Sequence, residues 1–100
     1  MFNFRKKVNS EELDHHRRCA IGRFSDGKYQ ETIDNCNLVL KFSANDDLAL
    51  EFKFRALLML GNDNDFDETT KVLNKLREVA PNNSAILKYD ETKKMLGIKI

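Results

Sequence analysis

Residues 27–40, with the sequence GKYQETIDNCNLVL, decide the fold of this chain. Gly27 is suited to ending one helix, and Tyr29 is predicted to begin the next and to point inward. Four apolar residues then recur at steps of three and four, which places them on one helical face: Ile33, Cys36, Val39 and Leu40. The stretch therefore predicts the turn and the second helix of a helical hairpin.

A second copy of this pattern follows along the chain. Gly61 lies 34 residues after Gly27, and an apolar-periodic stretch from Phe66 to Leu76 leads to Pro81. A fixed period of this length is typical of stacked helical repeats. The second copy carries about three extra residues around Asn62, Asp63 and Asn64, which are predicted to lengthen the turn before its second helix.

Five helices are predicted in all, and the fold class is all-α. Start and stop signals place them at about 11–24, 28–42, 46–60, from Phe66 to just before Pro81, and 84–96 with Gly97 as the stop. Asn9 and Ser10 are the start signal of the first helix. The predicted domain covers 10–97 behind a flexible segment, 1–9, and contains repeat one at 11–44, repeat two at 46–80 and a capping helix at 84–96.

Two smaller expectations concern the helix ends and faces. Asp65 and Glu68 form a plausible capping box for the fourth helix, whose inward residues are predicted to be Phe66, Leu73, Leu76 and Val79. Phe2 and Phe4, in the basic N-terminal segment, are candidates to pack onto an exposed helix face.

Composition limits the function. Apolar residues make up 41% of the chain, enough for a small core, and the net charge is +1. Nucleic-acid-binding domains are usually strongly basic, so RNA binding by helical repeats is only a third-ranked reading. We expect no membrane segment, because no stretch approaches the roughly 20 apolar residues that span a bilayer. Cys19 and Cys36 do not form a disulfide framework, which predicts a cytoplasmic location, with the nucleus as the alternative.

The sequence offers little chemistry. His15 and His16 precede Cys19 by about one helical turn, and a zinc site with Cys36 is conceivable, but the spacing matches no recognised ligand pattern. Both cysteines fall on predicted inward faces, where a thiol behaves as a small apolar group. We expect no catalytic residues, no metal, no cofactor and no enzyme activity.

The repeat pattern resembles the tetratricopeptide repeat (TPR) family, most of all the TPR domain of immunophilin-type co-chaperones. The resemblance covers roughly Leu13 to Leu96. The stretches that carry it are YxxxIDNCNxVL at 29–40, RALLxLG at 55–61, DFDE at 65–68 and PNN at 81–83. The resemblance implies antiparallel helix pairs with a concave groove lined by the first helix of each pair. Many members hold the acidic tail of a heat-shock chaperone there, with a clamp of lysine, asparagine and arginine side chains.

At the positions of that clamp this chain differs. The register puts Arg18 where the family usually has asparagine, and Leu48 and Phe52 where it has lysine and arginine. If the extra residues lie inside the third helix instead, Arg55 moves onto the clamp face. Carboxylate clamping and a groove used in another way therefore both stay open.

The same register predicts a partner-binding groove that is apolar and edged by arginines. Its residues are Arg17, Arg18, Ile21, Phe24, Leu48, Phe52, Arg55, Leu58, Met59 and Lys88, and Glu51, Tyr89 and Thr92 complete it. We expect a protein-protein interaction module of co-chaperone or scaffold type, with a protein or peptide partner that the arginines select for acidity. The alternative is a structural module that assembles a larger complex through its own groove. Two repeats and a cap leave apolar surface uncovered, so a homodimer or a tight complex is predicted over a stable monomer.

Overall fold

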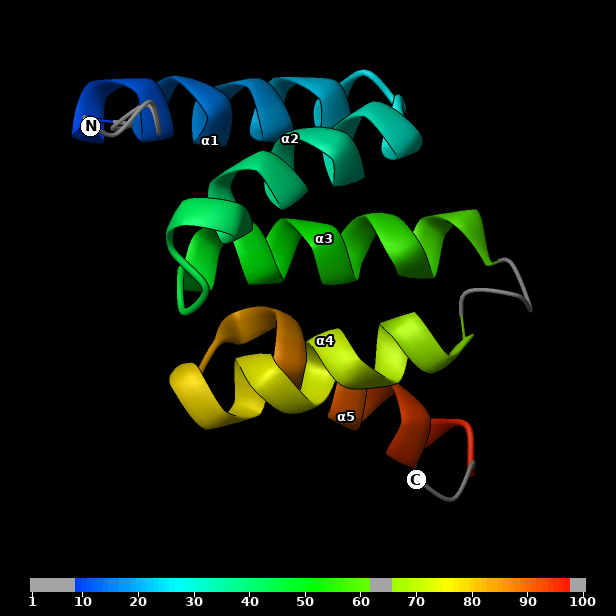
Figure 1. The fold of residues 1–100 in the computed structure, drawn as a ribbon. Helices are drawn as coiled ribbons and strands as arrows, with labels where there is room; N and C mark the ends of the chain where they lie inside the picture. Colours follow the sequence, from blue (N-terminus) through cyan, green and yellow to red (C-terminus); the bar gives the residue numbers. More distant parts are fainter. Residues whose placement is uncertain (1–8, 62–65, 98–100) are drawn as a thin grey trace.

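The computed structural model describes residues 9–61 and 66–97. This part of the chain folds into five helices and contains no strand (Figure 1). The helices are α1 (Ser10–Ser25), α2 (Tyr29–Phe42), α3 (Asp47–Leu60), α4 (Phe66–Val79) and α5 (Ser84–Met95). The predicted all-α class and the stacked helical hairpins are confirmed, with helix bounds within one or two residues of those expected.

The first, third and fifth helices begin in the same way. Each is capped by a side-chain oxygen that accepts a hydrogen bond from a backbone N–H of the first turn: Asn9 from Glu12 (2.8 Å), Asp46 from Ala49 (2.9 Å) and Asn83 from Ala85 (2.8 Å). The three caps are 37 residues apart along the chain. The structure therefore repeats its helix starts at one fixed interval, and the start predicted at Asn9 is confirmed.

Glycines in the left-handed region follow the same three helices. Gly27, Gly61 and Gly97 have φ angles of 77°, 57° and 72°. A residue with a side chain would adopt these angles only at a cost in free energy. The stops predicted at these glycines are confirmed.

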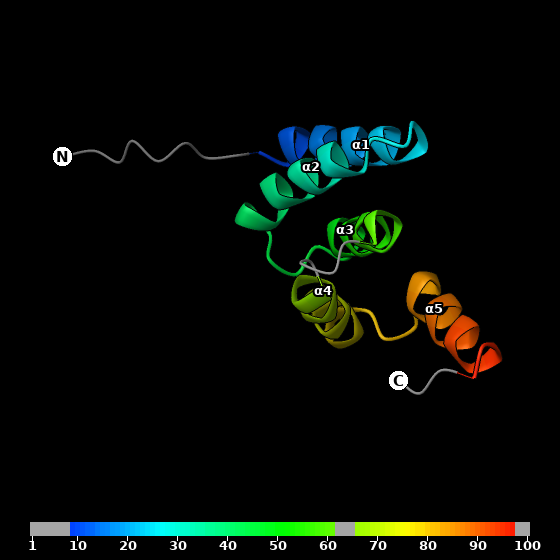
Figure 2. The ribbon, with the colours of Figure 1, turned by 90° about the vertical axis from the view of Figure 1, so that its right-hand side faces the viewer.

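Consecutive helices pack against one another, and α1 also contacts α3. In Figure 2, α3 and α5 lie on one side of the stack and α2 and α4 on the other, while α1 crosses the top. α3 and α5 thus share one face of the molecule (Figure 2).

The core consists of two adjoining clusters. The larger contains Ile33, Leu50, Phe54, Ala56, Leu57, Val72, Leu73, Leu76, Ala85 and Ile86, and the smaller contains Ala20, Cys36, Val39 and Ala49. Leu40 packs against both. Of the inward positions, Ile33, Cys36 and Val39 on α2 and Leu73 and Leu76 on α4 are confirmed as buried, and Tyr29, Leu40 and Val79 are half-buried against the same core.

One inward assignment is wrong. Cys36 is fully buried, but Cys19 is only partly buried. The reason is the place of Cys19 on α1: the covered face of this helix carries Leu13, Ala20 and Phe24, and Cys19 lies about 100° round the helix from Ala20, beside the exposed His15.

Several expectations fall outside the described residues. They concern the packing of Phe2 and Phe4, the extra residues at 62–64, the cap at Asp65 and the side chain of Phe66.

Candidate functional site

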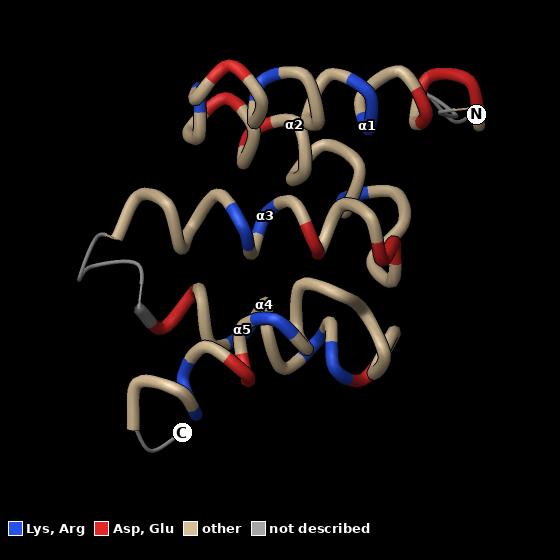
Figure 3. The backbone as a smooth tube through the Cα atoms, turned by 180° about the vertical axis from the view of Figure 1, so that it is seen from behind, with Lys and Arg blue, Asp and Glu red and all other residues tan. Residues whose placement is uncertain are grey.

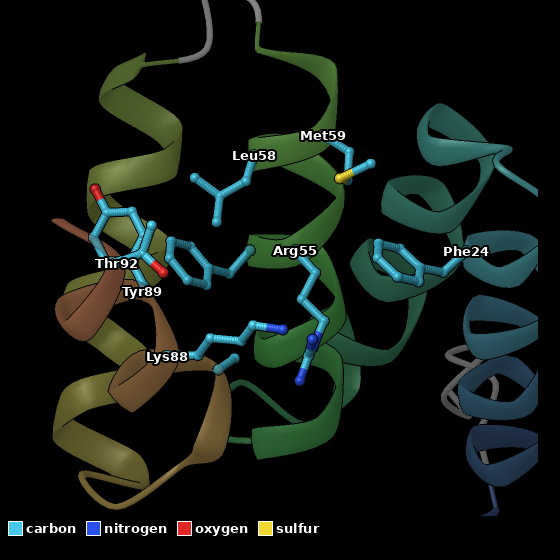
Figure 4. A pocket seen from close by; sticks show the side chains of 9 residues that line it. Phe24, Arg55, Leu58, Met59, Lys88, Tyr89 and Thr92 are labelled. Carbon is cyan, nitrogen blue, oxygen red and sulfur yellow. The ribbon is translucent and has the colours of Figure 1, made fainter. Parts of the chain in front are cut away.

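A groove lies along the face formed by α3 and α5, with the end of α1 beside it. It holds a cavity of about 250 Å³, whose lining residues come from all three helices (Figure 4). They are Phe24 from α1, Phe54, Arg55, Leu58 and Met59 from α3, and Ala85, Lys88, Tyr89 and Thr92 from α5. The cavity therefore sits where α3, α5 and the end of α1 meet.

Aromatic contacts hold the walls of the groove in place. The Phe24 ring meets Tyr29 and Phe52 edge-on at centroid distances of 5.4 and 5.5 Å, and the Phe54 ring meets Tyr89 edge-on at 5.2 Å. Edge-to-face pairs of this kind add about 0.5–1.5 kcal/mol each beyond the burial of the rings. Phe54 is fully buried and forms the floor.

The rim of the cavity is apolar and open to solvent. Leu58 and Met59 are 41% and 57% exposed, although both are large apolar side chains at the end of α3. Apolar groups grouped around a concavity mark interaction sites more often than isolated exposed ones do.

Arg55 is the guanidinium of the groove, and it is held by the chain itself. Its Nε and Nη2 donate to Glu51 Oε2 at 2.8 and 2.7 Å, and the guanidinium lies 5.6 Å from the centre of the Phe52 ring. Glu51 Oε1 in turn accepts a hydrogen bond from Asn83 Nδ2 at 3.0 Å. This network joins α3 to the start of α5 and offsets the positive charge of Arg55.

Lys88 is the other cation of the groove. It is exposed on α5, its side chain reaches toward α3 in Figure 4, and it forms no ion pair with any residue at 9–61 or 66–97. Lys88 thus brings an uncompensated positive charge to the cavity.

The structure brings part of the predicted groove together. Phe24, Arg55, Leu58, Met59 and Lys88 line one cavity, with Tyr89 and Thr92 beside them. Phe52 lies against the ring of Phe24 without lining the cavity. Ile21 and Leu48 are half-buried elsewhere on α1 and α3.

The two remaining arginines are placed differently from the prediction. Arg17 pairs with the capping carboxylate of Asp46, its Nε and Nη2 lying 2.7 and 2.5 Å from Oδ2, and this bond raises the pKa of the guanidinium. Arg18 is paired with Asp14 one turn away on α1. Neither lines the cavity, and both are matched by a carboxylate of the chain.

Phe54 and Ala85 line the cavity and were not predicted to do so. Phe54 lies one helical turn before Leu58, so the i, i+4 rule offered a signal for it. Ala85 had no such signal, because only the packing of α5 against α3 brings it to the cavity.

The histidines and cysteines do not assemble into a metal site in the described residues. Cys19 Sγ lies 3.5 Å from His15 Nε2, and no group of three His, Cys, Asp or Glu side chains converges in 9–61 or 66–97. Burial raises the pKa of the Cys36 thiol to about 12, which keeps it protonated and inert.

Comparisons with family models, curated proteins and solved structures found no match to this chain. Within 9–61 and 66–97, none of the helices has the length and apolar character required to cross a membrane. The groove is therefore the feature of the described chain from which a function can be inferred.

Proposed function

We propose that this chain is a protein-protein interaction module of the TPR adaptor type, which binds a partner polypeptide in the groove across α1, α3 and α5. The observation that carries the proposal is the cavity between α3 and α5, which is apolar, open and lined by residues predicted for binding. The caps at equal intervals and the glycine stops support a helical-repeat architecture. A co-chaperone or scaffold complex is the setting that this architecture suggests.

The lining suits binding. It presents aromatic rings, a methionine and a leucine, with a lysine and a paired arginine at the edge. Aromatic, methionine and arginine side chains are enriched in the centres of protein interfaces. Basic and acidic positions are interspersed along the helices, in keeping with the +1 net charge, so long-range attraction of a polyanion is weak (Figure 3).

A capture experiment tests the proposal. We expect the immobilised chain to retain a defined set of proteins from a cell extract. We expect Met59→Glu to lose that set, because a bound partner would bury a carboxylate at the rim of the cavity. Leu87→Glu is the matched control, since Leu87 is 54% exposed against 57% for Met59 and does not line the cavity. Equal capture by Met59→Glu and the wild type would refute the groove as the binding site.

Assembly of a larger complex by self-association through the same groove is the second candidate. The exposure of Leu58 and Met59 beside the cavity favours it, because burying them in a second copy would remove apolar surface from water. Sedimentation over a range of concentrations decides. A dimer that Met59→Glu dissociates supports self-association, and a monomer at high concentration removes it.

The acidic tail of a heat-shock chaperone is a specific partner that the family resemblance suggests. Such a tail would have to compete for arginines that are already paired with Asp46, Asp14 and Glu51. This competition favours a ligand that needs none of the three arginines.

A further inference from the structure

The electrostatics of the groove face are set by which cations are already paired. Arg17, Arg18 and Arg55 each have a carboxylate partner within the chain. The carboxylates of the two pairs nearest the groove are mostly buried, since Asp46 is 7% exposed and Glu51, which also accepts a hydrogen bond from Asn83, is 18% exposed. Withdrawing Arg55 from Glu51 would leave a mostly buried carboxylate without its cation, which is unfavourable.

Lys88 is therefore the lining cation that the cavity can offer to a ligand, while Lys93 lies outside the lining with its Nζ over the Tyr89 ring, 5.1 Å from the centroid. Its ammonium is unpaired within the described chain, and an ammonium group can bind a carboxylate at no cost to an existing pair. One available cation fits one carboxylate, and Arg55, the lining cation that could take a second one, is already paired with Glu51.

The apolar part of the groove sets a second requirement. A cavity of about 250 Å³ is smaller than the roughly 300–1,000 Å³ of sites that enclose drug-sized ligands. Its floor and walls are Phe54, Phe24 and Tyr89, and its rim is Leu58 and Met59. A space of this size and lining accommodates one large aliphatic or aromatic side chain.

We propose that the groove recognises a polypeptide segment with one large apolar side chain next to a single aspartate or glutamate. The apolar side chain fills the cavity between α3 and α5, and the carboxylate accepts hydrogen bonds from the Lys88 ammonium. This inference rests on the proposed function and specifies its ligand. It distinguishes the groove from a clamp for several carboxylates, since the arginines such a clamp needs are occupied.

Selection from a display library of random peptides tests the proposal. The full chain, Lys88→Glu and Lys94→Glu serve as three separate baits, and Lys94 is the matched control because it is exposed on α5 away from the cavity. Circular dichroism confirms that each bait is folded. We expect the wild type and Lys94→Glu to enrich peptides with one bulky apolar residue and one neighbouring acid, and Lys88→Glu to enrich lysine or arginine in place of the acid.

The affinity of a selected peptide then measures the contact between Lys88 and the acid. Lys88→Gln should weaken its affinity roughly fivefold, the size of an ion pair that is partly exposed. Replacing the acid of the peptide by its amide should cost the same factor, and the two changes together should cost no more than either, because they remove one shared contact.

The outcomes separate this inference from the function it rests on. The predicted pairing of Lys88 with one acid is wrong if the enriched peptides lack an acid or carry runs of acids. It is also wrong if the peptides selected with Lys88→Glu keep their acid. In each of these cases the groove is still a binding site. If the wild type enriches no peptide, the proposed ligand is also wrong. The capture experiment with Met59→Glu then tests the proposed function independently.

Discussion

At the scale of single residues, the predictions that held are those that depend on helical periodicity. Ile33, Cys36 and Val39 are buried because a face repeated every three to four residues on α2 meets helices on both sides. Cys19 lies outside the covered face of α1, which carries Leu13, Ala20 and Phe24, and it is partly exposed. Periodicity identifies a face, and the neighbouring helices decide how deeply that face is buried.

The charges of the groove were predictable only in part. Arg18 with Asp14 and Arg55 with Glu51 are i, i+4 pairs, so the sequence alone contained the signal that these arginines are neutralised. Arg17 with Asp46 joins two helices and could not be inferred without the packing of α1 on α3. A positive residue on a predicted groove face is evidence for an acidic partner only when its own neighbours leave it free.

Lys53 is a charged residue buried in the core. It is 8% exposed in the core face of α3, and its Nζ lies 2.7 Å from Glu68 Oε2. Glu68→Gln should lower the free energy of unfolding by about 1–2 kcal/mol, because the ammonium loses its anion while the half-exposed site lets some water replace it. Urea unfolding measures the loss. Glu78→Gln is the control, because it removes an exposed 3.5 Å pair with Lys75. It should lower the free energy of unfolding by less than about 0.5 kcal/mol. Equal losses in the two variants would contradict the role given to the burial of Lys53.

At the scale of the elements, the caps explain why the first, third and fifth helices start where they do. Asn9, Asp46 and Asn83 are short polar residues that accept from first-turn N–H groups, and the sequence pattern identified these starts closely. What it could not predict is that two of the caps do a second task. Asp46 also holds Arg17, and Asn83 also donates to Glu51 beside the groove.

This double role gives a graded prediction for the caps. Asp46→Ala should cost about 2–3 kcal/mol, because it removes a cap and leaves Arg17 without its carboxylate. Asn9→Ala should cost about 1 kcal/mol or less, since its bond is exposed and serves the cap alone. Urea unfolding of both variants compares them directly. A loss at Asp46 no larger than at Asn9 would show that the pair with Arg17 contributes nothing.

The fifth helix is tied to the fourth by a two-point ion pair. Arg77 Nη1 and Nη2 donate to the two oxygens of Asp90 at 2.7 and 2.8 Å, and these hydrogen bonds lower the pKa of the Asp90 carboxyl. A carboxyl with a lowered pKa in the folded state binds fewer protons than it does unfolded. Its contribution is therefore complete above its ordinary pKa and is lost as the pH falls through the lower, folded value.

The expected result is an acid-sensitive α5. Hydrogen exchange of the α5 amides should accelerate relative to α3 as the pH is lowered below about 4, after correction for the intrinsic pH dependence of exchange. In Asp90→Asn the faster exchange should already be present at neutral pH and change little with acid. Glu91→Gln is the control, because Glu91 is exposed on the same helix. Protection of α5 that falls equally in all three proteins would contradict the assignment to Asp90.

At the scale of the whole molecule, the hairpins share their core through α3. This helix contributes Leu50, Phe54, Ala56 and Leu57 to the larger cluster and Ala49 to the smaller one, and Leu40 of α2 touches both. The stack of hairpins was predictable from two glycines and one period. The position of the groove was not fully predictable, because it depends on how α5 packs against α3. The rings of Phe54 and Tyr89 meet at this contact.

A shared core predicts one cooperative transition for the described helices. Leu76 is fully buried on α4, and Leu76→Ala should lower the free energy of unfolding by about 2–5 kcal/mol through lost burial and a cavity. Leu87 is exposed, and Leu87→Ala should lower it by less than about 0.5 kcal/mol.

Two tyrosines can report on the two hairpins separately. They are Tyr29 on α2 and Tyr89 on α5, and the chain has no tryptophan, so Tyr29→Phe and Tyr89→Phe each leave one fluorescent reporter. Because α3 belongs to both clusters, Leu76→Ala should shift the urea midpoint seen by either tyrosine by the same amount. A midpoint at Tyr29 that stays in place while that at Tyr89 falls would mean that the first hairpin is stable without the second.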